Sequence, residues 1–276
     1  ELKKHVFVVT SDNYIKAQTT FGEGDSYIMY NVIYPSKINF TFDMIKNEIQ
    51  WNVMNQRGSP VPRLIAIQAT IDDRTPLYRH PADEQPQVVT WTPIVLTIRN
   101  YLSKLLNKDL NHVLIQLYRD GDDNIGEHCD KTLDIMKGSL IANYSIGATR
   151  VLTLRTKNNE NGRDKEKVEL LNNSLFCLGL ETNKKWLHGI RPDKRFESDK
   201  LFDDLREGGQ RISFTFRTIN TFIDKNGNLT GQGAPKCETD DDSLDLVRAF
   251  SKENHESDFN WDLYYGNGFK SLNFKF

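Results

Sequence analysis

The sequence predicts a mainly β fold with flanking helices, a jelly roll or related barrel, and two observations support this prediction. Four short segments show a residue period of two, which is typical of strands. Turns rich in Gly and Asp separate them, which favours a jelly roll over a doubly wound α/β sheet. The four segments are residues 112–118, 151–154, 175–178 and 212–216.

The region before these strands mixes strands with two expected helices. Residues 1–40 are expected to form an N-terminal extension with two strands near 5–9 and 27–30. Pro60, Pro62, Pro76 and Pro81 break helical patterns in residues 58–86, so strands joined by exposed loops are expected there. Helical spacing predicts helices over 41–54, with Thr41 as N-cap and Phe42, Ile45, Ile49 and Val53 on one face, and over 93–106.

The C-terminal part is expected to pack on the main domain. The polar run 157–167 reads as a long hairpin loop, and after Thr221 the chain passes through an acidic run, a helix with Leu244, Val247 and Phe250, and an aromatic tail. The tail could dock a partner or cover the barrel. The second is favoured because an exposed aromatic patch invites aggregation. The expected domains are 1–40, 41–224 and 225–276, the last an extension packed on the main domain.

Composition and charge limit the expected cellular location and partners of the protein. No run of eighteen apolar residues and no signal-peptide pattern is present, and the three cysteines lack zinc-type spacing, so we expect the nucleus or cytoplasm and no membrane. The net charge of -2 lacks the basic excess of a broad nucleic-acid binder. A local basic face or a merely solvated loop is predicted around Lys184, Lys185, Arg191, Lys194 and Arg195.

A metal site is indicated by His128, Asp130 and His188. Residues two apart in a strand point to the same side, so His128 and Asp130 can converge while Cys129 faces away and packs. Two histidines and a carboxylate with an open face suit non-haem iron(II). A structural role for His128 is the alternative.

The segment 211–217 predicts a site for a diacid. Its apolar residues occupy one strand face, and Arg211 and Arg217 occupy the other. An arginine that points into a barrel is costly unless a carboxylate meets it, so a five-carbon diacid is expected between the two guanidiniums, with one carboxylate on each. An edge strand whose arginines face water is the alternative.

Residues 62–222 resemble the AlkB-like family of 2-oxoglutarate dioxygenases. The resemblance rests on the motifs Tyr118-Arg119-Asp120-Gly121, Ile125-Gly126-Glu127-His128-Cys129-Asp130 and Ser145-Ile146-Gly147-Ala148-Thr149-Arg150, on His188, and on the arginine strand. It implies a double-stranded β-helix, Fe(II), 2-oxoglutarate as co-substrate, O2 and supporting ascorbate. It also implies catalytic metal ligands at His128, Asp130 and His188, and a co-substrate site formed by Gln116, Tyr118, Arg211, Ser213 and Arg217.

The implied reaction is oxidative demethylation of alkylated bases in DNA or RNA, with the base extruded into the pocket. Tyr78 is expected to stack on the base, or to close the core, and Arg79 to contact phosphate. Thr132 stands where nucleobase demethylases of the family carry an acidic residue that contacts the base. The near-neutral charge, Thr132 and the terminal extensions favour the alternative of a protein side chain or small metabolite as substrate, and a non-catalytic binding module is the third possibility.

Overall fold

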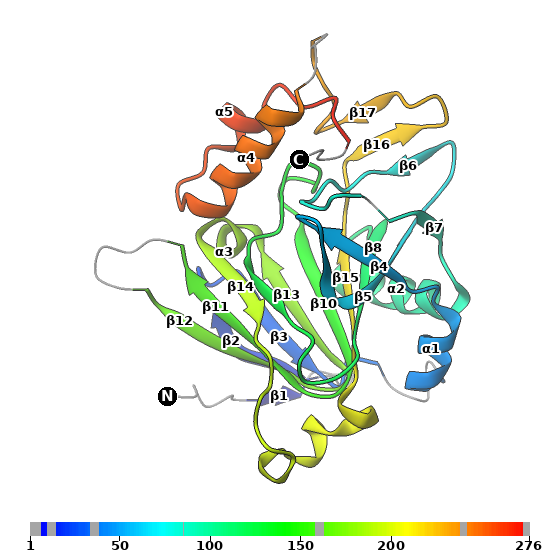
Figure 1. Ribbon diagram of the computed structural model, residues 1–276, viewed down its shortest axis with the longest axis vertical. Helices are drawn as coiled ribbons and strands as arrows, with labels where there is room; N and C mark the ends of the chain where they lie inside the picture. Colours follow the sequence, from blue (N-terminus) through cyan, green and yellow to red (C-terminus); the bar gives the residue numbers. More distant parts are fainter. Residues whose placement is uncertain are drawn as a thin grey trace.

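The computed structural model describes residues 7–9, 15–33, 39–84, 86–157, 163–237 and 242–272, with side chains described from residue 20 onward. Two antiparallel sheets face each other and helices cover the outside (Figure 1), which confirms the predicted jelly roll and its double-stranded β-helix form. No helix among these residues has the length and apolarity needed to cross a membrane.

The larger sheet has ten strands and supplies most of the core. The order is β1 (Phe7–Val9), β2 (Ile15–Phe21), β3 (Ser26–Tyr30), β13 (Ser174–Gly179), β10 (Leu140–Gly147), β15 (Arg211–Arg217), β8 (His112–Tyr118), β5 (Ser59–Ala69) and β4 (Asn52–Gln56), with β7 (Val88–Thr90) parallel to β5. Strand β3 pairs with β13, so the strands of the expected N-terminal extension continue the main sheet.

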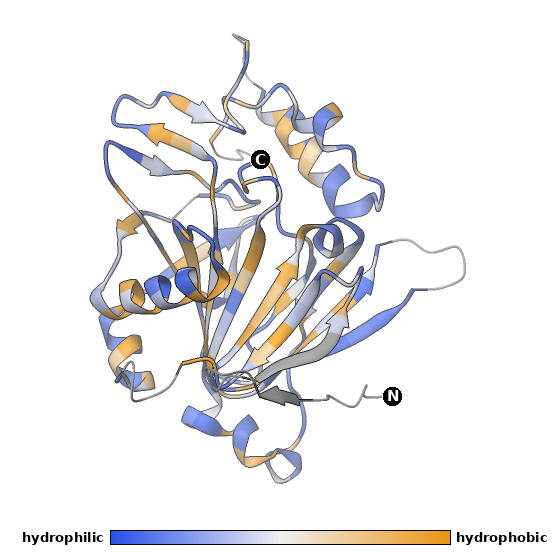
Figure 2. Cartoon of the chain, turned by 180° about the vertical axis from the view of Figure 1, so that it is seen from behind, coloured by the Kyte–Doolittle hydropathy of each residue, from blue (hydrophilic) through white to orange (hydrophobic). Residues whose placement is uncertain are grey.

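Two smaller sheets complete the architecture. The four-stranded one has the order β12 (Lys165–Leu170), β11 (Arg150–Thr156), β14 (Trp186–Ile190) and β9 (Ile125–His128). The three-stranded one consists of β17 (Leu229–Gly231), β16 (Thr221–Asp224) and β6 (Arg74–Pro76). Figure 2 shows apolar residues gathered on the central strands, while hydrophilic residues dominate β12 at the edge.

Helices α1 (Phe42–Glu48) and α2 (Pro93–Leu106) pack on the outer face of the larger sheet. Their apolar stripes meet the outward-facing residues of β8, β10 and β15. The predicted helix over 41–54 is therefore too long, because the chain turns after Glu48 and pairs as β4 with β5. Val53 lies in β4 and is 62% exposed.

The hairpin between β4 and β5 explains how a proline-rich segment forms a strand. Arg57 and Gly58 both have positive φ, at 54° and 74°, which matches a two-residue hairpin turn. Pro60 and Pro62 follow near the exposed tip, where lost ladder hydrogen bonds cost least.

The C-terminal part packs on the barrel, as predicted for the aromatic tail. Helices α4 (Ser243–His255) and α5 (Trp261–Tyr265) bury a cluster that includes Phe250, Tyr265 and Phe269 around Leu133 of the main domain.

Helix α3 (Leu180–Lys185) links β13 to β14, and three short 3-10 turns, Glu197–Asp199, Phe202–Asp204 and Arg206–Gly209, precede β15. The acidic run lies outside the described residues except for Asp242.

Candidate metal centre and co-substrate site

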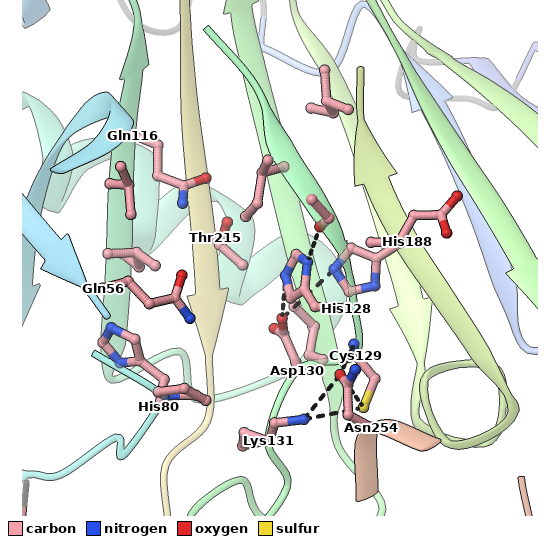
Figure 3. A pocket seen from close by; sticks show the side chains of 18 of the residues that line it. Gln56, His80, Gln116, His128, Cys129, Asp130, Lys131, His188, Thr215 and Asn254 are labelled. Atoms are coloured by element: carbon pink, nitrogen blue, oxygen red, sulfur yellow. Dashed lines mark hydrogen bonds and ion pairs between the residues drawn. The ribbon is translucent and has the colours of Figure 1, made fainter. Parts of the chain in front are cut away.

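The structure brings His128, Asp130 and His188 together. His128 and His188 are cross-strand partners in the register of β9 and β14. Each Nε2 lies 3.6 Å from Oδ1 of Asp130, and the three ligand atoms lie within 4.8 Å of one another. The three side chains point toward one another in Figure 3. Two imidazoles and one carboxylate in this arrangement form the ligand set of non-haem iron(II).

Backbone geometry around the ligands makes this convergence possible. Gly189 follows His188, and a Cβ at Gly189 would lie 3.0 Å from the carbonyl oxygen of Ile125, so glycine lets β14 approach β9 closely. Asn183 of α3 holds the backbone of Asp130 from both sides: its Oδ1 accepts from the Asp130 N–H at 2.9 Å and its Nδ2 donates to the Asp130 carbonyl at 2.9 Å.

The protonation states of the three groups suit metal binding. Nδ1 of His128 lies 2.8 Å from the carbonyl oxygen of Gly126, which can only accept, so Nε2 keeps its lone pair for a metal. Burial lowers the pKa of His188 to about 3, so this imidazole is neutral at physiological pH. Burial alone would raise the pKa of Asp130, but the charge of Arg217 and the two histidines hold it well below its ordinary value.

Arg217 is paired with one of the three metal ligands. Its Nε and Nη2 donate to Oδ2 of Asp130 at 3.1 and 2.6 Å, and its Nη1 donates to the carbonyl of Thr215. Asp130 therefore already supplies a carboxylate to Arg217, and the expected contact of Arg217 with a carboxylate of the co-substrate stays a prediction. The contact between Arg217 and Asp130 leaves Oδ1 of Asp130 directed toward the histidines.

Arg211 has the features of an anion site. Its side chain points into the barrel, as predicted, and is fully buried. Nη2 donates to Ser145 Oγ at 2.7 Å and to Asn143 Oδ1 at 3.2 Å, whereas Nε and Nη1 have no hydrogen-bond partner. No carboxylate pairs with Arg211 among the described residues. Burial lowers its pKa to about 10. A buried guanidinium with two nitrogens that lack hydrogen-bond partners fits the carboxylate of a diacid co-substrate.

The remaining predicted co-substrate residues surround the same interior face. Gln116, Tyr118 and Ser213 all line the cavity beside Asn143. The Tyr118 hydroxyl donates to Gln116 Oε1 at 3.3 Å, and the guanidinium carbon of Arg211 lies 5.2 Å from the Tyr118 ring centroid. Asn143 Nδ2 donates to Ser213 Oγ at 2.9 Å. These groups form a polar end of the cavity, next to the buried guanidinium of Arg211.

The predicted substrate residues behave differently from expectation. Thr132 does not line the cavity, because its N–H and hydroxyl both donate to Oε1 of Glu253 on α4. Tyr78 lines the cavity but is only 6% exposed. The guanidinium carbon of Arg217 lies 4.2 Å from the centroid of the Tyr78 ring, which also stacks on the His80 ring. These contacts favour the alternative in which Tyr78 closes the core over the one in which it stacks on a base.

Arg79 is a structural anchor, so its expected contact with phosphate is wrong. It is fully buried, and its Nη2 lies 2.7 Å from Oδ1 of Asp134. The guanidinium also donates to the carbonyls of Gly233 and Phe269, both at 2.8 Å. The charge of Arg79 thereby ties the C-terminal part to the main domain.

We expect Arg79→Met to destabilise the protein by about 3–5 kcal/mol, because Asp134 would stay buried without its partner. Urea unfolding measures this change. The control Arg248→Met removes an arginine whose side chain is 75% exposed, and it is expected to change stability by less than about 0.5 kcal/mol. Equal stability of the two variants would contradict the anchoring role.

A cavity of about 620 Å³ opens above the metal ligands. Four cationic side chains and two carboxylates line it: Arg57, Arg63, Lys131 and Arg217, with Glu127 and Asp130. Of the five residues predicted as a basic face, Lys185, Arg191 and Arg195 lie near acidic partners, Glu23, Glu127 and Asp193. The cavity lining therefore carries the positive excess that the overall composition lacks.

A double-stranded β-helix that holds two histidines and an aspartate at one end of its interior, with a buried arginine on the same interior face, defines a non-haem iron oxygenase. The family model described as the 2OG-Fe(II) oxygenase superfamily matches residues 25–217. The chain belongs to this superfamily, whose members use Fe(II) and 2-oxoglutarate, and about half of it is similar to AlkB-like proteins.

Curated relatives with AlkB-like names match about half of the chain. The chain is 31% identical to DNA oxidative demethylase ALKBH2 of Mus musculus over 134 residues, which are 47% of this chain and 52% of the relative. It is 30% identical to alpha-ketoglutarate-dependent dioxygenase alkB homolog 3 of Bos taurus over 135 residues, 47% of this chain and 43% of the relative. The chain thus spans about half the length of the relatives that it matches. The solved structure of OsALKBH1 aligns with this chain with a TM-score of 0.47 and 15% identity. The alignment covers 70% of this chain and 98% of the OsALKBH1 chain.

Proposed function

We propose that this protein oxidatively demethylates alkylated bases in DNA or RNA. The observation that carries the proposal is the pairing of the His128, Asp130 and His188 cluster with a buried arginine, Arg211, that lacks a carboxylate. Fe(II), 2-oxoglutarate and O2 would supply the oxidation of a methyl C–H bond, after which the hydroxymethyl group leaves as formaldehyde.

Some residues of the chain would hold the metal and the co-substrate, and others would exclude water from the cavity. His128, Asp130 and His188 would hold the metal, and Arg217 keeps Oδ1 of Asp130 turned toward it. Arg211, Tyr118 and Gln116 would bind the far carboxylate of 2-oxoglutarate. Apolar residues between the sheets, among them Leu152 and Phe176, would keep bulk water from this part of the cavity.

Nucleic acid is supported as the substrate by the cavity charge and by the relatives. The cavity lining carries four cationic side chains and two carboxylates, and this positive excess attracts the phosphate groups of a nucleic acid. Two groups of matched relatives carry names that include DNA oxidative demethylase and alkB homolog 3.

A substrate panel tests the proposal. The protein is incubated with Fe(II), 2-oxoglutarate and ascorbate in air, together with N-methylated DNA or RNA oligonucleotides or with methylated peptides. Formaldehyde and the mass of the substrate are measured. The expected result is formaldehyde together with unmethylated oligonucleotide, and neither product from the Asp130→Ala variant. Turnover of peptides alone would replace the nucleic-acid proposal with the protein side-chain alternative.

A further inference from the structure

The last turns of α4 form one wall of the cavity above the metal ligands. Val247, Ser251, Asn254 and His255 line the cavity, and their spacing of three or four residues places them on one face of the helix. Ser251 and His255 are exposed, whereas Val247 and Asn254 are half-buried. The C-terminal part therefore supplies polar groups to the cavity mouth.

Contacts to the metal-binding segment fix the position of this wall. Asn254 Oδ1 accepts from the Cys129 N–H at 3.1 Å and from Lys131 Nζ at 3.2 Å. Glu253 is 2% exposed, and its carboxylate accepts from the Thr132 N–H at 3.0 Å. Figure 3 shows Asn254 beside Cys129 and Lys131, the two neighbours of Asp130 in the chain. Any movement of α4 would thus disturb the segment that carries Asp130.

A second set of contacts holds α4 from the other side. The Tyr265 hydroxyl donates to Glu253 Oε2 at 2.6 Å, and the Phe250 and Tyr265 rings meet edge to face at 6.0 Å. Lys157 Nζ donates to the Glu253 carbonyl in the last turn of the helix. The wall is therefore preorganised, which reduces the entropy cost of binding a substrate against it.

We propose that Ser251 and His255 contact the substrate strand next to its methylated base, so that the C-terminal helix helps to select the substrate. This inference rests on the proposed function. A hydroxyl and an imidazole both donate and accept hydrogen bonds, which suits the edge of a base or a phosphate oxygen. Val247 adds an apolar contact on the same helix face. Gln56 and His80 line the cavity on the far side of the metal ligands from Asn254 (Figure 3), so polar side chains border the cavity opposite α4 as well.

A binding experiment with matched double variants of the full chain tests the role of α4. Ser251→Ala with His255→Ala removes two polar groups from the cavity face. Asp245→Ala with Arg248→Ala removes two from the outer face of the same helix, where both side chains are exposed. The probe is a fluorescein-labelled single-stranded oligonucleotide with one N-methylated adenine, bound in the presence of Mn(II) and 2-oxoglutarate and followed by anisotropy.

The cavity-face variant is expected to bind the oligonucleotide about tenfold more weakly, the equivalent of one or two lost hydrogen bonds. Its affinity for 2-oxoglutarate and the binding by the outer-face variant are expected to match wild type. Equal oligonucleotide affinity in the two double variants, with demethylation by wild type intact, would overturn the role of α4 alone. Absence of demethylation by wild type would overturn the proposed function and this inference with it.

Discussion

Asp130→Ala is expected to lower turnover by at least about 10³-fold, because the loss of a metal ligand removes about 4 kcal/mol of transition-state stabilisation. The substitution also leaves Arg217 buried without its carboxylate, so metal affinity and stability both fall. Succinate formation measures turnover, and calorimetry with Mn(II) measures metal binding independently of activity.

Cys129→Ala is the matched control, because Cys129 lies between two ligands in the chain yet directs its sulfur to α4. Its Sγ lies 3.3 Å from the carbonyl oxygen of Glu253. This variant is expected to bind Mn(II) with wild-type affinity. Unchanged Mn(II) binding by the Asp130→Ala variant would show that the cluster does not hold a metal.

Arg211→Met is expected to raise the dissociation constant of 2-oxoglutarate by about 100-fold, since a carboxylate would lose its buried, charge-assisted partner at a cost of about 3 kcal/mol. In the absence of 2-oxoglutarate the same variant is expected to be at least as stable as wild type, because it removes a buried charge that no carboxylate in the described part of the chain neutralises.

Arg217→Met provides the contrast for this experiment. Its guanidinium is paired with Asp130, so removal leaves a buried carboxylate alone and is expected to cost about 3–5 kcal/mol of stability. Urea unfolding without 2-oxoglutarate separates the two arginines. Equal destabilisation by both substitutions would contradict the assignment of Arg211 as the anion site.

Strand alternation predicted the interior-facing arginines because it depends only on local geometry. Ile212, Phe214 and Phe216 pack on the helices, so Arg211 and Arg217 must face the other sheet. The pairing of Arg217 with Asp130 was not predictable in the same way. Asp130 reaches Arg217 only because β15 and the segment after β9 converge in the folded chain, at a sequence separation of 87 residues.

Other site residues carried little signal in the sequence. Asn183 holds the backbone of Asp130 from a short helix, and Asn143 holds Arg211 from a neighbouring strand, yet an isolated asparagine is common in any chain. The failures at Arg79 and Thr132 have one cause. Both are predicted to contact the substrate, whereas in the structure the C-terminal part covers both.

The facing positions of His128 and His188 on β9 and β14 have a mechanical consequence. Strand β9 is only four residues long, lies at the edge of its sheet, and is joined to β14 through two register pairs. A metal ion bound by both imidazoles would cross-link these two strands. Loading of the ion would then tighten the rim of the barrel and slow exchange of the β9 amide protons with solvent, so that iron contributes to the framework as well as to the chemistry.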